Sequence, residues 1–286
     1  MQLGDIIDGF NFQLFPTRCR EITDGVFGEF FSVHPSLKLY SVFGNHEATC
    51  FSRATFKEIV DTHQPNDTHW GPKSDEFYYN FSPCPGWVFV VVDAYDISLK
   101  SREVTSSQYQ EAVRIIKSNT NNPVCWEEGT GDYFSGLLED EKDTPKMRFV
   151  PFNGGIGKQQ LHWLEEVLFR ASGAHDKVII FSHIPISDNN MSGLNKPSSC
   201  TLLYNYKEVL NLISRINTPH KTVVAVFSGH QHEGAYGVEN EVHHVTFQSP
   251  LIFSHCAPTY ATVQLYADHI NITGSGGIPS RVLSFC

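Results

Sequence analysis

Two histidines separated by a single residue lie in a glycine-bounded turn, in the segment FSGHQHEGAY at residues 227–236. A run of β-branched and apolar residues leads into this turn, so His230 and His232 follow the end of a predicted strand. Neutral imidazole is a frequent ligand of divalent transition metals. The spacing is typical of a metal site, whose remaining ligands must come from elsewhere in the chain.

Other polar residues follow apolar runs in the same way. Asp5 lies in LGDIIDG, Asn45 and His46 lie in FGNHEA, and His183 lies in FSHIP. Ligands of α/β proteins bind beyond the carboxyl ends of the strands, so we expect these residues to gather at one edge of a sheet. Carboxylate, carboxamide and imidazole groups without cysteine favour Mn, Fe or Zn over a structural zinc–thiolate site.

The elements that must position these residues alternate along the chain. Strands covered on both faces are predicted by near-continuous apolar runs at 37–43, 87–92, 177–183 and 222–230. Apolar residues at helical spacing predict helices over 107–118, 157–172 and 206–216. An antiparallel meander that closes a second sheet is predicted by the consecutive runs 243–250, 261–267 and 268–276. The pattern indicates a layered α/β fold.

Composition bounds the function. The chain has 286 residues, which suits a single domain over 1–286, and its net charge of -10 disfavours a nucleic-acid partner. The longest apolar run, WVFVVV at 87–92, is too short to cross a membrane, and no signal peptide is evident. We therefore expect a cytoplasmic protein with no membrane partner and no obligate protein partner. The polar, acidic segment 119–148 is predicted to be a surface insertion or lid.

Taken together, the segments GDIIDGFN, GNHE, DAYD, FNGGI, SHIPI and GHQHEGAY resemble the calcineurin-like metallophosphoesterase superfamily. Within it, they resemble the manganese-dependent ADP-ribose/CDP-alcohol diphosphatases. The likeness runs from Leu3 to the C-terminal strands. It implies a double β-sandwich flanked by helices and two divalent metals, with Mn ahead of Zn, Fe or Mg.

The resemblance also implies which residues hold these metals. Asp5 would bridge both of them, and Asn45, His183 and His230 would complete one site. His232 would belong to the other site.

A reaction follows from the resemblance. A hydroxide shared by two metals about 3.5–4 Å apart would attack phosphorus, while His46 would face the phosphate and donate a hydrogen bond or proton. ADP-ribose, CDP-choline or CDP-glycerol would be cleaved at the diphosphate bond to give a nucleoside monophosphate. Asn153 and Phe10 are predicted substrate contacts. A structural loop is the alternative for Asn153, and core packing is the alternative for Phe10.

One motif of the family has no counterpart in the sequence. It is an Asp followed two residues later by His or Gln, and it precedes the GD motif, whereas only Met1, Gln2 and Leu3 precede Gly4. We therefore expect an N-terminally incomplete domain that lacks the first strand and helix of the family, with one metal site impaired and weak activity. An incomplete sequence and a genuine short form are both open explanations.

Two other functions stay open at this stage. A cyclic-nucleotide phosphodiesterase shares the GNH and GHxH segments and differs only in its pocket. A non-catalytic metal-binding remnant would be the outcome if the impaired site no longer supports turnover. Among the remaining polar residues, we expect Glu47 to brace the helix that follows GNH, and we expect Asp93 and Asp96 to be structural.

Overall fold

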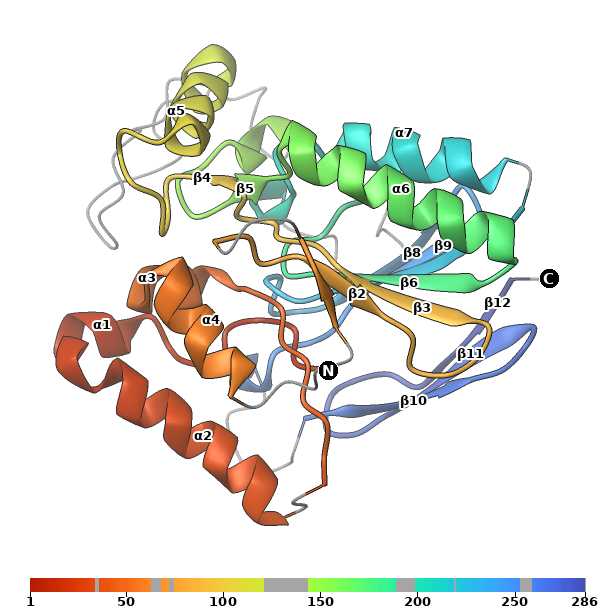
Figure 1. Ribbon diagram of the computed structural model, residues 1–286, viewed down its shortest axis with the longest axis horizontal. Coiled ribbons are helices and arrows are strands. Elements are labelled where there is room, and N and C mark those ends of the chain that lie inside the picture. The colour runs from red at the N-terminus through yellow and green to blue at the C-terminus, as the bar shows by residue number, and fades with distance from the viewer. Residues whose placement is uncertain are drawn as a thin grey trace.

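The structure is a computed structural model, and it describes residues 1–33, 36–62, 68–71, 75–120, 144–188, 199–218, 220–252 and 259–285. Its centre is a seven-stranded sheet (Figure 1). The strands in spatial order are β1 (His69–Trp70), β2 (Tyr79–Phe81), β3 (Trp87–Val91), β6 (Lys177–Ser182), β7 (Val223–Ser228), β9 (Val242–Thr246) and β8 (Ala235–Glu239).

The middle of this sheet is parallel and its edges are antiparallel. Strands β3, β6, β7 and β9 run in one direction, whereas β2 and β8 pair with their neighbours in the opposite direction. All residues of β7 and nearly all of β6 are buried, as expected for parallel strands that are covered on both faces. The carboxyl ends of β6 and β7 therefore lie side by side at one edge of the sheet.

Helices cover one face of the large sheet. Figure 1 shows α6 (Lys158–Ala174) and α7 (Tyr206–Asn217) lying along it, and they contact β6 and β7 respectively. The small sheet of β4 (Ile97–Ser98) and β5 (Gly154–Gly155) lies next to α5 (Ser107–Asn119). The N-terminal part contributes four helices, α1 (Phe10–Leu14), α2 (Cys19–Val33), α3 (Asn45–Cys50) and α4 (Arg53–Asp61).

A second sheet lies on the other side of the large one (Figure 1). It is antiparallel and consists of β10 (Ala261–Leu265), β11 (His269–Gly274) and β12 (Arg281–Ser284). Its inward side chains, Ile270, Ile272 and Leu283, are buried in the same core as the strands of the large sheet. The two sheets form a sandwich with one continuous apolar core.

The predicted α/β fold is confirmed, and two strand assignments are wrong. Residues 37–43 form only an isolated bridge, in which Ser41 pairs with Gln2, rather than a strand. Residues 242–246 form β9, which is fully buried and joins the large sheet beside β7 instead of the C-terminal meander. The reason is that the β8–β9 hairpin folds back onto β7. Most of the predicted insertion, 121–143, lies outside the described residues.

Helices α1, α2 and α4 and the short strand β8 are elements that the sequence patterns did not predict. Among the helices of the described ranges, none combines the length and the apolar character needed to cross a membrane.

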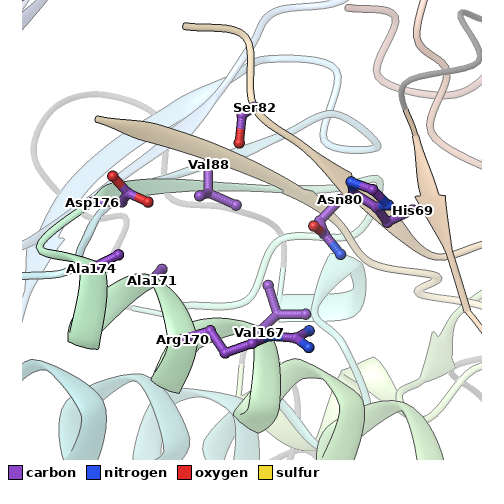
Figure 2. Close-up of a pocket in the computed structure, with 9 residues that line it drawn as sticks. All are labelled: His69, Asn80, Ser82, Val88, Val167, Arg170, Ala171, Ala174 and Asp176. Carbon is purple, nitrogen blue, oxygen red and sulfur yellow. The ribbon is translucent and has the colours of Figure 1, made fainter. Parts of the chain in front are cut away.

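A cavity of about 470 Å³ lies between the edge strands and α6 (Figure 2). Figure 2 shows Asn80 and His69 on one side of it, with Arg170 and Val167 rising from α6 below. None of its lining residues is one of the polar residues that the sequence placed at strand ends. The cavity is therefore separate from the predicted metal site.

Candidate metal centre

The ends of β6 and β7 bring predicted ligands together. His183 follows β6 directly, and His230 follows β7 after Gly229. One ligand atom from each of Asp5, His183 and His230 lies within 4.8 Å of the other two. Asp5 and His230 have positive φ angles of 58° and 64°, which few non-glycine residues adopt. Such backbone strain is concentrated at functional sites, where surrounding contacts hold it in place.

Asn45 lies at the centre of this cluster, as the first residue of α3. Its Oδ1 atom is 3.0 Å from His183 Nε2 and 3.1 Å from His230 Nδ1. His183 Nε2 is also 3.3 Å from Asp5 Oδ2. The structure therefore brings together four of the five predicted metal ligands, from segments as far apart in the chain as residues 5 and 230.

The hydrogen bonds around the cluster leave it rich in lone pairs. His183 Nδ1 lies 2.7 Å from the Leu3 carbonyl oxygen, so in the neutral ring this nitrogen carries the proton and Nε2 presents a lone pair to Asn45 and Asp5. Burial acts to lower the pKa of His183, but the adjacent Asp5 carboxylate outweighs burial and raises it. Burial, reinforced by the nearby His183, lowers the pKa of His230 well below its usual value and keeps the ring neutral. Lone pairs that face one another repel unless a cation lies between them, so this donor set fits a divalent metal.

Asp5 supplies the negative charge of the site. Burial acts to raise its pKa, but the adjacent His183 and His46 outweigh burial and hold the pKa of Asp5 well below its usual range. The carboxylate is therefore ionised at neutral pH. An ionised carboxylate beside imidazole nitrogens is a suitable ligand for Mn or a similar metal.

Glu47 braces the start of α3, as expected, and it also binds the backbone of the GD segment, which was not expected. Its carboxylate accepts hydrogen bonds from the backbone N–H groups of Asp5 at 2.8 Å, Ile6 at 2.5 Å and Gly44 at 2.9 Å. The side chain is completely buried. Burial and the neighbouring charge of Asp5 raise the pKa of Glu47 to about 7. Glu47 therefore joins the GD segment to the GNH segment at the site.

His46 lies beside the cluster but outside it. Its Nδ1 atom accepts a hydrogen bond of 2.9 Å from the Gly9 N–H, so in the neutral ring Nε2 carries the proton. The backbone N–H of His46 donates to Asp5 Oδ1 at 3.0 Å. A fifth of the side chain is exposed. The residue can therefore donate a hydrogen bond to a bound group, although its catalytic role stays a prediction.

The other predicted residues are placed differently. His232 is exposed and is not brought into the cluster. Phe10 is 63% exposed on α1, so it does not pack in the core, and its contact with substrate stays a prediction. Asn153 is completely buried, with Oδ1 2.9 Å from His230 Nε2. Its placement favours support of a metal ligand over direct contact with substrate.

Lys100 also belongs to this region, although no pattern in the sequence pointed to it. Only 1% of it is exposed, and its Nζ atom donates to the Asn45 carbonyl oxygen at 3.2 Å and to Thr49 Oγ1 at 2.5 Å. Lysine is seldom buried, and nothing in its local sequence signals this position. It holds the first turn of α3, from which Asn45 and His46 project.

The two aspartates of the DAYD segment are structural, as expected. Asp93 is fully buried and forms an ion pair with Arg53, which is also buried. Asp96 pairs with Arg102 at 3.0 Å. These ion pairs hold the loop after β3 rather than facing the metal ligands.

Comparison with known proteins agrees with this geometry. Residues 1–234 match the model of the calcineurin-like phosphoesterase family. The manganese-dependent ADP-ribose/CDP-alcohol diphosphatase of Bos taurus is 30% identical over 295 residues, which cover 100% of this chain and 79% of the relative. The protein of the same name from Xenopus laevis is 31% identical, with 100% and 76% covered.

A solved structure gives the same result. The crystal structure of a dimetal phosphatase from Danio rerio has a TM-score of 0.76 and 28% identity, and the match covers 100% of this chain and 83% of the other. Its fold, the matching family model and the cluster of four predicted ligands all agree. The chain belongs to the calcineurin-like phosphoesterase family.

Proposed function

We propose that this chain is a metal-dependent hydrolase that cleaves the diphosphate bond of ADP-ribose and of CDP-alcohols such as CDP-choline and CDP-glycerol. The observation that carries the proposal is the convergence of Asp5, Asn45, His183 and His230 on one point. The relatives named above as manganese-dependent diphosphatases support the substrate class. The products are AMP with ribose 5-phosphate, or CMP with a phospho-alcohol.

The residues of the site have two functions, metal binding and hydrogen bonding to the phosphoryl group. Asp5, Asn45, His183 and His230 hold the metal, which when bound supplies an acidified water and neutralises charge on the phosphoryl group. His46 donates its Nε2–H to a phosphoryl oxygen, on which negative charge increases as the bond to the leaving group breaks.

The leaving group needs little help. It is itself a phosphate monoester and a weak base, so it departs without a strong general acid. This agrees with a site in which His46 has the Nε2–H available for a hydrogen bond to the phosphoryl group.

Two further residues complete the proposal. His232, two residues after His230, is the ligand that we assign to a second metal, and its exposed ring leaves it free to turn toward one. Phe10 follows Gly9, whose N–H bonds to His46, and we assign its exposed ring to contact with the substrate. A nucleobase can stack on this ring.

The test measures the release of nucleoside monophosphate from ADP-ribose and CDP-choline with Mn²⁺, for the chain and for a His46→Ala variant. We expect His46→Ala to lower kcat by about 100-fold or more while Mn²⁺ binding is retained, because the lost donor acts on the transition state. The matched control is His162→Ala, since His162 is exposed on α6 and its ring lies 3.4 Å from Glu166 rather than in the ligand cluster.

Two results would overturn the proposal. A chain that hydrolyses a cyclic nucleotide but neither ADP-ribose nor CDP-choline would instead be a cyclic-nucleotide phosphodiesterase. Binding of Mn²⁺ without turnover of any of these substrates would favour a non-catalytic metal-binding protein.

A further inference from the structure

Asn153 lies in the loop before β5, far in sequence from His230, and it has no exposed surface. We infer that Asn153 is a positioning residue that fixes which ring nitrogen of His230 carries the proton, and so leaves the other nitrogen free to bind a metal. The inference rests on the proposed metal-dependent function. It extends that function to a residue that does not itself contact the metal or the substrate.

The orientation of the Asn153 amide follows from its partners. Its Nδ2 atom lies 2.9 Å from the carbonyl oxygen of Arg148 and 2.5 Å from that of Cys200. Carbonyl oxygens only accept hydrogen bonds, so the NH₂ group must face them and Oδ1 must face the other way. Both protons of the amide are thereby used, and the oxygen is directed at His230.

The proton on His230 follows from this orientation. Its Nε2 atom is 2.9 Å from Asn153 Oδ1, which can only accept, so Nε2 carries the proton. The lone pair of the neutral ring is then on Nδ1, which lies 3.1 Å from Asn45 Oδ1 on the side of the cluster. The other tautomer would direct an N–H group into the metal site and would leave Asn153 Oδ1 buried without a donor.

His183 has the same arrangement with a different partner. There the backbone carbonyl of Leu3 accepts a hydrogen bond from Nδ1–H, which in the neutral ring leaves the Nε2 lone pair for the cluster. Each imidazole of the cluster therefore has one acceptor behind it that sets its tautomer. For His183 that acceptor is main chain, whereas for His230 it is a side chain that substitution can remove.

Asn153 also connects His230 to two turns of the chain. Arg148 ends the 3-10 turn Pro145–Arg148, and Cys200 lies in the 3-10 turn Ser199–Thr201. The two carbonyl bonds hold the amide in place from both turns. An amide so held loses little conformational freedom when it orients the imidazole, which is the property required of a support behind a metal ligand.

The experiment compares Asn153→Leu with Asn153→Asp and with a control, Asn205→Leu. Leucine removes the acceptor at similar volume. Aspartate retains an oxygen toward His230 when its other oxygen, which faces the Arg148 and Cys200 carbonyl groups, is protonated. Asn205 is a matched control because its amide bonds Ile156 N–H at 3.0 Å and the Ile156 carbonyl at 2.8 Å but no metal ligand. Mn²⁺ affinity is measured by calorimetry without substrate, and the His230 tautomer is measured by ¹⁵N NMR of the metal-free chain.

We expect wild-type His230 to be protonated on Nε2. Asn153→Leu should bind Mn²⁺ about 10- to 100-fold more weakly, which is the usual effect of removing a support behind a metal ligand. Asn153→Asp should retain both the tautomer and an affinity no weaker than about threefold below wild type, and Asn205→Leu should retain wild-type affinity.

Three results would overturn the inference. They are a wild-type His230 protonated on Nδ1, an Asn153→Leu variant with wild-type affinity, and an equal loss in Asn153→Leu and Asn205→Leu. Failure of the proposed function is distinguishable from these, because a chain that cleaves no diphosphate can still bind Mn²⁺ and show the expected tautomer.

Discussion

A methyl group added at Gly4 is predicted to displace the predicted metal ligand His183 and so to weaken metal binding. Gly4 has a φ of 93°, and a Cβ atom built on it would lie 2.2 Å from His183 Nδ1. Ordinary contact begins at 3.4 Å, so the imidazole would have to retreat by about 1.2 Å. The backbone of Gly44 lies only 3.0 Å from the same position, so the added methyl group would meet main chain as well as the imidazole.

The displacement is large compared with what a metal site tolerates. Metal–ligand distances vary by only about 0.2 Å between working sites. A shift of this size would also break the 2.7 Å hydrogen bond from His183 Nδ1 to the Leu3 carbonyl. We therefore expect Gly4→Ala to lower Mn²⁺ affinity by about 100-fold or more, and turnover by a similar factor.

Gly86→Ala separates this effect from simple backbone strain. Gly86 has a φ of 81° but no atom within 4 Å of the added Cβ. Both variants should lose about 1–2 kcal/mol of stability from the unfavourable φ in thermal unfolding of the metal-free chain. Only Gly4→Ala should lose Mn²⁺ binding in calorimetry. Wild-type affinity in Gly4→Ala, or the same loss in Gly86→Ala, would refute the reasoning.

Two further predictions concern stability. Arg53→Met should lower the free energy of unfolding by about 3–5 kcal/mol in urea, because it leaves the buried carboxylate of Asp93 without its partner. The double variant Arg53→Met/Asp93→Asn should recover part of this loss, and a double variant no more stable than the single one would contradict the explanation. Burial, with His243 nearby, lowers the pKa of His244 from 6.5 to about 3. Between these two pH values the ring is protonated in the unfolded chain and neutral in the folded chain. Stability from this residue is therefore complete above pH 6.5 and falls by about 1.4 kcal/mol per pH unit below it. His244→Leu should flatten the pH dependence between pH 6.5 and 5, and an unchanged slope would count against this role.

The strand-end residues were predictable because the backbone itself places them. An apolar run that ends in His183 and another that ends near His230 must deliver both side chains to the same edge once the strands lie parallel and adjacent. Asn45 was grouped with them on the same grounds, but residues 37–43 form only an isolated bridge to Gln2, and Asn45 reaches the cluster as the first residue of α3. Hydrophobic periodicity predicts these strands and their ends, and it does so without any knowledge of the loop conformations.

The contacts of buried polar side chains and the sheet that a hairpin joins could not be predicted, because both depend on the tertiary structure. Asn153 in FNGGI was equally suited to a substrate contact and to a structural loop, because a sequence does not show what an amide faces. The burial of Lys100 depends on the first turn of α3 lying above it. Strand β9 was assigned to the wrong sheet because alternation identifies a strand but not its neighbours.

The three hydrogen bonds that Glu47 accepts bear on how the chain folds. They join residues separated by up to 42 positions, and His183 and Asn45 are separated by 138. Closing such loops costs entropy before any contact compensates for it, so contacts of this kind form late in folding. Backbone N–H groups hold the GD and GNH segments together through Glu47, so hydrogen bonds of the protein itself help to bring Asp5 and Asn45 together. We therefore expect Mn²⁺ to bind ligands that the fold has already arranged. In a zinc finger, by contrast, metal binding drives the folding of the domain.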